Sequence, residues 1–243
     1  MRNLLLISGL CVLITGTAFS QKTDRERDGL KGPVKTVRVR QVTTSSEDGK
    51  QSESPLLLTH EVTYDQSGNR TELAFYDRTG TLSRRIAYQY DPETKRRAGL
   101  ITYNSQNAIV RKVADKYGSS GFKVSSTIQD FNDDGTLFRK TEITFGTLGE
   151  LTEVAEYQGD GSLIKKVGLP FKEAEGENAI SARGRPREDV DRVVSFGQRA
   201  GEYFDPDHHG NWTRGMTAST SRTYSSGKNA KTTVWAYREF TYY

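Results

Sequence analysis

Tyr64-Asp65-Gln66-Ser67-Gly68 is the stretch that decides the fold, because versions of it return along the chain. Tyr76-Asp77-Arg78-Thr79-Gly80 and Phe131-Asn132-Asp133-Asp134-Gly135 keep the same order: an aromatic residue, then Asp or Asn, and finally Gly. A type I turn favours a short side-chain acceptor at its first position and a residue tolerant of positive φ at its fourth. Gly adopts that conformation freely, and such a turn commonly joins antiparallel strands. The stretch therefore predicts a β-hairpin turn.

The leading aromatic residue recurs in steps of 12 to 14 residues. The series is Tyr64, Tyr76, Tyr90, Tyr103, Tyr117, Phe131, Phe145 and Tyr157, and Trp212 joins it as a further repeat or binding-surface residue. Because side chains change face at every residue of a strand, even steps predict that successive aromatics occupy equivalent positions in the sheet. Packing across strands is the simpler interpretation of the series, and a row that stacks on a ligand is the alternative.

Between the turns lie segments of nine or ten residues in which apolar and polar side chains alternate. Period two is typical of strands, so the predicted fold class is all-β: an antiparallel β-meander of repeated hairpins, either an open twisted sheet or a partly closed barrel. The Tyr90 unit departs from the rule, since Asp91-Pro92-Glu93-Thr94-Lys95 has neither Gly nor Asn at its end. We therefore predict a break in the ladder after Tyr90.

The ends of the chain are organised differently. Residues 1–20 have one charge, Arg2, then an apolar stretch and small residues before Gln21, which predicts a signal peptide and an exported protein in the periplasm, at the cell surface or secreted. Cys11 lies inside this stretch after Leu10, where a lipoprotein site would require a smaller residue, so we expect no lipid anchor. The apolar stretch is also too short for a transmembrane helix.

The rest of the chain divides into a β-repeat domain over 21–171, a charged loop over 172–192 and C-terminal strands over 193–243 that complete the same sheet. We expect strands at Leu30–Arg40 and Leu56–Tyr64 around a polar hairpin loop, Ser45–Ser54. Phe204–Thr213 resembles a longer version of the repeated turn, with Gly six residues after the aromatic. A final hairpin is predicted with arms at Trp212–Tyr224 and Thr232–Tyr243.

Charge and composition exclude several classes of function. Removing residues 1–20 lowers the net charge from +4 to +3, and the Arg183, Arg185 and Arg187 cluster lies among acidic residues, so we expect no nucleic-acid partner. The region after residue 20 has no cysteine, which excludes disulfides and thiolate chemistry there. No nucleophile elbow, zinc-protease motif or phosphate-binding glycine loop is present, so we predict no enzyme and no cofactor.

Two clusters could hold a metal ion. Asp130, Asn132, Asp134 and Gly135 match the first half of a calcium loop, but the closing Glu is missing, and a turn capped by its own carboxylates is the preferred interpretation. His208 and His209 are adjacent, and in an extended chain they would point to opposite faces. We therefore predict no metal site, and we retain the turn around His208 and His209 as the best position for an enzyme on a β-scaffold.

Tyr64-Asp65-Gln66-Ser67-Gly68-Asn69-Arg70-Thr71 resembles the tyrosine-aspartate (YD) repeat of the bacterial rearrangement-hotspot family, and Tyr76–Gly80 and Phe204–Thr213 are similar to it. The units are also similar to the short tyrosine and glycine repeats of the membrane occupation and recognition nexus type. The resemblance implies an exported β-repeat scaffold, here a short member without a toxin domain. We expect a structural or interaction module of the bacterial envelope whose partner is an unknown envelope protein or a glycan. An outer-membrane β-barrel is the alternative, although Glu239 and Arg84 would face lipid.

Overall fold

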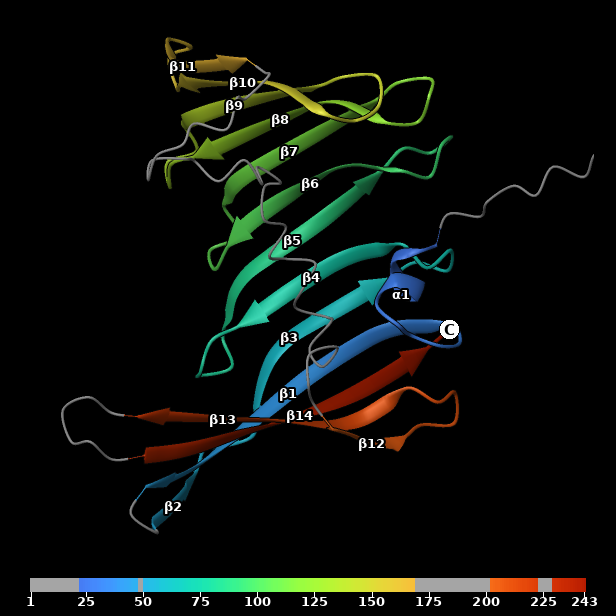
Figure 1. Cartoon of the computed structure of the whole chain (residues 1–243), viewed down its shortest axis with the longest axis vertical. Coiled ribbons are helices and arrows are strands. Elements are labelled where there is room, and N and C mark those ends of the chain that lie inside the picture. Colours follow the sequence, from blue (N-terminus) through green and yellow to red (C-terminus); the bar gives the residue numbers. More distant parts are fainter. Residues whose placement is uncertain (1–21, 48–49, 169–201, 223–228) are drawn as a thin grey trace, which may run out of the picture.

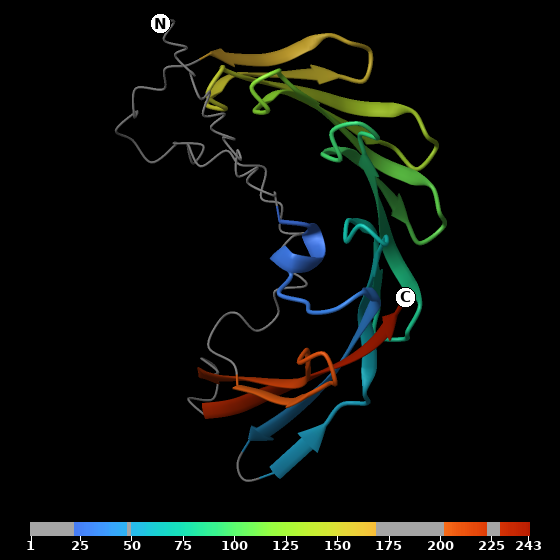
Figure 2. The same cartoon turned by 90° about the vertical axis from the view of Figure 1, so that its right-hand side faces the viewer.

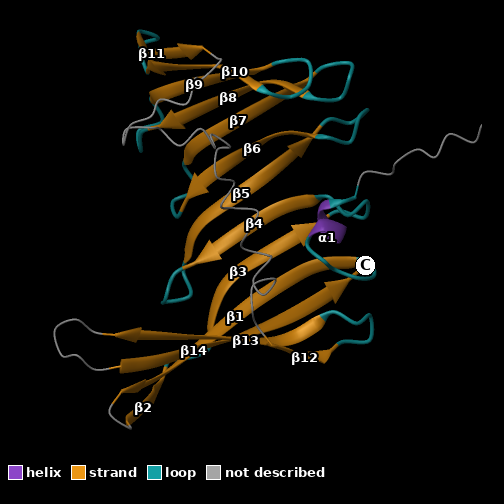
Figure 3. Cartoon of the chain, viewed as in Figure 1, coloured by secondary structure: helices purple, strands orange, loops and turns teal. Residues whose placement is uncertain are grey.

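The computed structural model describes residues 22–47, 50–168, 202–222 and 229–243. These residues form one short helix and a single sheet of fourteen strands, which confirms the all-β class (Figure 3). The elements are α1 (Asp24–Arg27), β1 (Val34–Glu47), β2 (Lys50–Glu53), β3 (Leu57–Tyr64), β4 (Arg70–Tyr76), β5 (Leu82–Tyr90), β6 (Arg97–Asn104), β7 (Ile109–Tyr117), β8 (Lys123–Phe131), β9 (Leu137–Phe145), β10 (Leu151–Gln158), β11 (Leu163–Gly168), β12 (Glu202–Pro206), β13 (Trp212–Arg222) and β14 (Asn229–Tyr242).

The sheet is antiparallel, open and mostly a meander (Figure 1). From β3 to β11 each strand pairs with the next, as the repeated hairpins predict. The C-terminal strand β14 closes a long-range ladder with β1, from Val34 opposite Tyr242 to Ser46 opposite Lys231. The predicted final hairpin is confirmed as β13 and β14, and it joins the sheet beside the first strand of the chain, a placement that the repeat does not encode.

The repeated turn has one backbone geometry throughout the described chain. In eight turns the N–H of the first residue donates to the carbonyl of the fifth, and the N–H of the fourth donates to the carbonyl of the first. The fourth residue has positive φ in each, from 62° at Asn107 to 88° at Gly161. In four of these turns the side chain of the opening residue, Asp65, Asp77, Asn104 or Asp207, accepts backbone N–H groups, as Asp77 does from Thr79 and Thr81. The predicted turn chemistry is confirmed.

The predicted break after Tyr90 is wrong. Strands β5 and β6 pair from Arg84 opposite Asn104 to Tyr90 opposite Arg97, with a register shift at Tyr90 like those at the other turns. The turn is one residue longer: Asp91 N–H donates to Arg96 O, and Lys95 takes the positive φ of 57° that Gly takes elsewhere. A lysine in the left-handed conformation thus replaces the missing glycine, and the ladder continues.

Two further expectations need correction. The polar loop predicted over Ser45–Ser54 is largely paired, because β1 runs to Glu47 and β2 folds back on it, with Ser45 opposite Ser52. The turn in Phe204–Thr213 is of the ordinary length, because Asp207 opens it and Gly210 takes the positive φ. Pro206, opposite Trp212, occupies the place of the aromatic residue. The turn unit therefore begins at Pro206, two residues after the aromatic Phe204 from which a longer turn was predicted.

The sheet is curved, with α1 on its concave side (Figure 2). Alternate residues of the central strands face this side and form the core, including Val37, Val62, Leu73 and Ile86, each 1% exposed or less. These four lie opposite one another in neighbouring strands, since Val37 pairs with Val62, Val62 with Leu73, and Leu73 with Ile86. The other face has cross-strand ion pairs such as Arg38 with Glu61.

Some expectations lie outside the described residues. They are the signal peptide at 1–20 and the charged loop at 172–192. Within the described part of the chain, α1 is the one helix, and it is far too short and too polar to span a bilayer.

Candidate functional site

A depression lies between α1 and the turns that follow β3, β5 and β7, and we call it the α1 groove. Its volume is about 790 Å³, within the range of small-ligand sites. It is lined by Lys22, Thr23, Asp24, Arg27, Asp28, Ser67, Asn69, Arg70, Tyr90, Thr94, Lys95, Arg96, Arg97, Tyr117, Ser120, Gly121 and Phe122. Most of these side chains are polar, so the groove is suited to a hydrophilic ligand.

The helix that forms one wall is only four residues long and depends on its surroundings. Thr23 caps it: the Thr23 hydroxyl accepts from Glu26 N–H, and the Glu26 carboxylate accepts from Thr23 N–H. Arg25 N–H donates to the carbonyl of Gly68 at 2.9 Å, in the turn after β3. The Asp24 carboxylate accepts from Arg70 N–H at 3.1 Å. These bonds attach the helix to the first YD-like unit.

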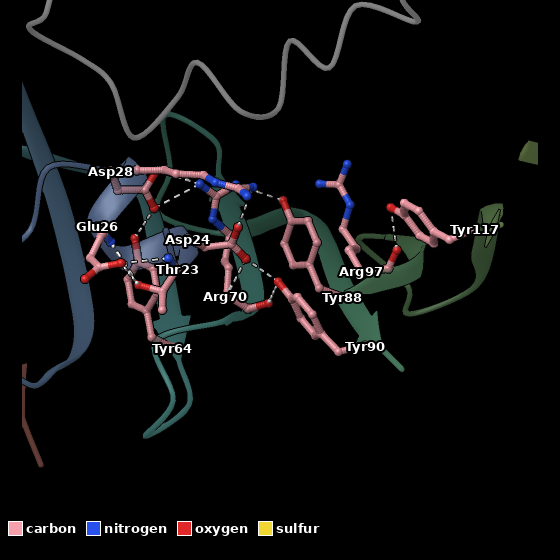
Figure 4. A network of polar contacts seen from close by, with 11 residues as sticks. Thr23, Asp24, Glu26, Asp28, Tyr64, Arg70, Tyr88, Tyr90, Arg97 and Tyr117 are labelled. Atoms are coloured by element: carbon pink, nitrogen blue, oxygen red, sulfur yellow. Dashed lines mark hydrogen bonds and ion pairs between the residues drawn. The ribbon is translucent and has the colours of Figure 1, made fainter. Parts of the chain in front are cut away.

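Arg70 and Asp28 form the buried centre of this attachment (Figure 4). Arg70 Nη2 lies 2.8 and 2.9 Å from the two Asp28 oxygens, and the two side chains are 5% and 6% exposed. The Tyr64 hydroxyl donates to the same carboxylate. A buried carboxylate and guanidinium each cost free energy to desolvate, so each requires the other. The pair therefore holds the N-terminal segment against the sheet.

A second set of side chains continues along the groove (Figure 4). Arg70 Nη1 donates to the Tyr88 hydroxyl at 3.3 Å, and the guanidinium carbons of Arg70 and Arg97 lie 5.5 and 6.0 Å from the Tyr88 ring centroid. Tyr90 donates to Asp24, and its hydroxyl is 3.0 Å from the carbonyl of Arg70. Tyr117 repeats this placement one hairpin later, with its hydroxyl donating to the carbonyl of Arg97 at 3.1 Å.

The electrostatic environment keeps the phenols of Tyr64 and Tyr90 and the guanidinium of Arg70 protonated at neutral pH. Burial, with the nearby carboxylates adding to it, raises the pKa of Tyr64 and of Tyr90 above the usual value of a phenol. Burial acts to lower the pKa of Arg70, but Asp28, Tyr88 and Tyr64 together outweigh it, and the net pKa is raised. Burial also raises the pKa of Asp28, against the opposing effect of Arg70. Both oxygens of Asp28 are already bonded, so this carboxyl is a structural group.

The opposite wall comes from the longer turn between β5 and β6. Lys95 is exposed and has the left-handed backbone noted above. Arg96 donates through Nη1 to the carbonyl of Gly121, and its guanidinium carbon lies 5.5 Å from the Tyr117 ring centroid. The turn after β7 is thus tied to the turn after β5. The irregular unit of the repeat supplies consecutive cations to the groove.

The repeated aromatics do not form one row, and successive rings are not in equivalent positions. Each strand reverses the direction of the chain, so successive aromatics lie at opposite ends of the strands and on opposite faces. Tyr64, Tyr90 and Tyr117 lie beside α1 or in its groove, and Phe145 has the parity of the buried Ile143. The other face has Tyr76, Tyr103, Phe131 and Tyr157, three of which lie under a cation: Tyr103 under Arg85, Phe131 under Lys112 and Tyr157 under Lys140. Aromatic residues therefore occupy equivalent positions in every second strand, once per hairpin.

The turn that contains His208 and His209 brings both histidine rings into contact with each other and with Tyr242. The rings of His208 and His209 lie 4.1 Å apart between centroids, and both contact Tyr242, so the expectation of opposite faces is wrong. The residues are in a turn, where the alternation of a strand does not apply. Asn211 next to them is 3% exposed and exchanges bonds with the backbone of Lys31, donating to its carbonyl and accepting its N–H. Trp212 packs under Arg238, whose guanidinium carbon is 4.3 Å from its ring centroid.

The candidate calcium loop is a turn that uses its own side chains. Asp134 accepts from the N–H and the hydroxyl of Thr136, and Asp130 pairs with Arg111 at 2.5 Å. Across residues 22–47, 50–168, 202–222 and 229–243, the structure has no group of three His, Cys, Asp or Glu side chains suited to a metal ion. The described carboxylates of the α1 groove are bonded to arginine and tyrosine.

Comparisons with known proteins show no family for this chain. No protein-family model matches the chain, and no curated protein matches it. Among solved structures, a porin-like protein from Bacteroides uniformis aligns over 87% of this chain and 99% of its own, with 9% identity and a TM-score of 0.35. A DUF1329 family protein from Desulfovibrio piger covers 89% of this chain and 90% of its own, with 8% identity and a TM-score of 0.27. A putative outer membrane lipoprotein-sorting protein domain from Vibrio parahaemolyticus covers 90% and 89%, with 9% identity and a TM-score of 0.22.

Proposed function

We propose that the protein is an exported, non-catalytic binding module of the bacterial envelope, built as a short scaffold of YD-like β-repeats, and that the α1 groove is its binding site. The observation that carries the proposal is the preformed polar groove of about 790 Å³, whose wall is fixed by the buried pair of Arg70 and Asp28. A site of this kind is organised before the ligand arrives, which lowers the ordering cost of binding.

The perturbed groups of the groove support a binding role over a catalytic one. General acid–base catalysis works best with a pKa near the working pH. Tyr64, Tyr90 and Arg70 all have a pKa shifted away from neutrality, and the oxygens of Asp28 are occupied by Arg70 and Tyr64. These side chains are arranged to hold the walls of the groove.

Filling the groove tests the proposal. Ser120 is exposed in the turn after β7 and lines the groove, so Ser120→Trp is expected to obstruct it without disturbing the core. Gln106→Trp is the matched control, because Gln106 is exposed at the same position of the turn after β6, at the other end of the strands. Wild-type protein and the control should bind the same members of a glycan array or retain the same envelope component, and Ser120→Trp should lose them. Equal binding by all three proteins would contradict the site.

Export is tested separately by fractionation. The full chain should be recovered outside the cytoplasm and begin near Gln21 on N-terminal sequencing, because residues 1–20 have the layout of a signal peptide. A chain that lacks residues 2–20 should stay in the cytoplasm. Recovery of the full, uncleaved chain in the cytoplasm would contradict the envelope assignment and leave the groove to be tested in its own right.

A further inference from the structure

The charges of the α1 groove are strongly unbalanced. Its lining includes six cationic side chains, Lys22, Arg27, Arg70, Lys95, Arg96 and Arg97, against two carboxylates, Asp24 and Asp28. The chain as a whole has a net charge of only +4, with 35 basic and 31 acidic residues. The groove alone thus has an excess of four positive charges, as large as that of the entire molecule. Clefts lined by one sign of charge concentrate ligands of the opposite sign.

Neither carboxylate is available to repel an anion or to bind a metal ion. Asp28 is bonded to Arg70 and Tyr64 and is 6% exposed at its side chain. Asp24 accepts from the Arg70 N–H and from Tyr90, and Arg27 Nη1 lies 3.6 Å from it. Internal bonds therefore neutralise both acids. The cations outside these pairs include Lys22 before α1 and the consecutive Lys95 and Arg96 on the opposite wall.

The cationic wall is formed by the turn that breaks the rule of the repeat. Seven of the eight regular turns place Gly at the positive φ and one places Asn107, whereas the longer turn places Lys95 there at 57°. An L-residue other than Gly or Asn pays a conformational cost in this region, so lysine is a poor choice for the turn itself. Next to it, Arg96 is fixed by Gly121 and by the Tyr117 ring. The local sequence is unfavourable for folding and favourable for placing positive charge.

We infer that the α1 groove binds a small multivalent oxyanion, a ligand with two or more phosphate, sulfate or carboxylate groups, held between Lys22 on one wall and Lys95 and Arg96 on the other. The inference rests on the proposed function and names the chemistry of its ligand. Guanidinium and ammonium groups form strong charge-assisted hydrogen bonds to such oxygens. The hydroxyl of Ser120, which also lines the groove, adds a neutral donor.

The size and limits of the positive region favour a small ligand over a nucleic acid. The groove is a bounded space of about 790 Å³. On the opposite face of the sheet, cations are matched with acids, as Arg38 is with Glu61 and Arg85 with Glu72. A nucleic-acid site would require a continuous basic stripe that follows a backbone of phosphates. Here the positive excess is concentrated within the groove.

Titration calorimetry on the full mature chain tests the inference with three probes. They are inorganic tripolyphosphate, a heparin-derived tetrasaccharide, and vesicles of cardiolipin, whose headgroup has two phosphates, in phosphatidylcholine. Saturable binding of one molecule or headgroup per chain to at least one probe is expected, and it should weaken as the salt concentration rises toward about 0.15 M because exposed charges are screened. The probe that binds identifies the source of the anion. Lack of saturable binding to all three would overturn the inference.

The decisive variant is Lys95→Asn with Lys22→Gln. Asn tolerates positive φ, so Lys95→Asn removes the charge and keeps the turn, and the melting temperature should not fall. The affinity for the bound probe should fall about tenfold, since each exposed charge contact contributes up to about fivefold. Lys116→Gln with Lys165→Gln is the control of equal charge, because both lysines are exposed and lie outside the groove. Equal weakening by both pairs would mean unspecific attraction and would overturn the site.

The same proteins separate this inference from the proposed function. If Ser120→Trp abolishes binding of an envelope component while none of the three anions binds, the groove is a binding site for another class of ligand and the anion inference fails. If an anion binds with the expected loss in the lysine variant while no envelope component depends on the groove, the anion site stands and the envelope role fails.

Discussion

The two halves of the sheet obey one rule of turn and strand but differ in what their concave sides bury. In the packed half, formed by β14, β1, β3, β4 and β5, every member of the main core cluster apart from Leu30 belongs to a strand, and Val37, Val62 and Leu73 are fully buried. In the distal half, from β6 to β11, the corresponding face has Arg111, Asp130 and Arg139, which lie opposite one another in neighbouring strands. Hairpin formation and core formation are therefore separate properties of this chain.

The boundary between the halves is the hairpin of β5 and β6, with its longer turn. On one side Ile86 is 1% exposed, whereas on the other side Ile128, which shares the same face, is partly exposed. The α1 groove lies at this boundary, where Arg70 and Tyr90 of the packed half meet Arg97 and Tyr117 of the distal half. The proposed binding site thus lies where the buried network of one half gives way to the solvated face of the other.

The largest expected effect is the loss of the buried ion pair. Arg70→Met should destabilise the fold by about 3 to 5 kcal/mol, because it leaves the Asp28 carboxylate buried without its partner. The double variant Asp28→Leu with Arg70→Met should recover most of that loss, since neither charge then remains buried. Urea unfolding followed by circular dichroism measures both. A loss below about 1 kcal/mol in the single variant would show that α1 is not held by this pair.

Deleting equivalent side chains in the two halves measures the difference in packing. Ile86→Ala should cost about 3 kcal/mol, whereas Ile128→Ala on the same face should cost about 1 kcal/mol because Ile128 is already partly solvated. The two substitutions remove the same atoms, so the native environment accounts for the difference in unfolding free energy. Equal costs would contradict the division into a packed and a distal half.

The packed half should also respond to mild acid through His60. This side chain is 3% exposed, and burial, with a contribution from Arg238, lowers its pKa from 6.5 to about 4. A depressed folded-state pKa contributes stability that is complete above pH 6.5 and is lost as the pH falls toward 4, because the unfolded chain then binds the proton first. Between pH 7.5 and 5 the loss due to His60 should be about 2 kcal/mol.

The contribution of His60 can be isolated with His60→Phe, which keeps a ring and removes the titration. The difference in unfolding free energy between wild type and variant should change with pH by about that 2 kcal/mol, while the acids common to both proteins cancel. A constant difference from pH 7.5 to 5 would mean that His60 stays neutral in the unfolded chain or can be protonated in the folded one.

The smallest effects concern the turns on the two sides of β5. Gly80→Ala should destabilise by about 1 kcal/mol through backbone strain alone, since a Cβ at φ 81° would have no heavy atom within 4 Å. Lys95→Gly should stabilise by about the same amount by relieving that strain. Thermal and urea unfolding measure both changes. A destabilised Lys95→Gly would mean that the lysine side chain supports the fold at the boundary.

The sequence carried a large share of the fold because hairpins are local. The order of aromatic, acid and glycine in Tyr64–Gly68 requires only neighbouring residues to form its turn, and period two placed the strands that follow. The same local rules predicted a break after Tyr90 that does not occur, because Lys95 adopts the left-handed conformation and closes the turn. The prediction of a longer turn from Phe204 was also wrong, because the unit begins two residues later, at Pro206. Turn chemistry tolerates such exceptions at a cost of about 1 kcal/mol.

The candidate site was much less visible. Tyr90 and Tyr117 were among the predicted residues, and Arg70 is part of the first YD-like stretch, but nothing near Arg70 in the chain indicates that its partner is Asp28, 42 residues earlier. Lys95, Arg96 and Arg97 are consecutive in the sequence, and the departure of their turn from the repeat was the available signal of a special site. Asp24 and Asp28 had no signal, because a four-residue polar helix has no periodicity to detect.

By itself, then, the order of amino acids determined where this chain bends and which segments extend between the bends, since both depend on interactions among residues a few positions apart. Only the tertiary structure decided that β14 pairs with β1, that alternate aromatics take opposite faces, and that the N-terminal helix meets the YD-like units to enclose a cationic groove. Those contacts join residues far apart in the chain, and their free energy exists only when the whole sheet has assembled.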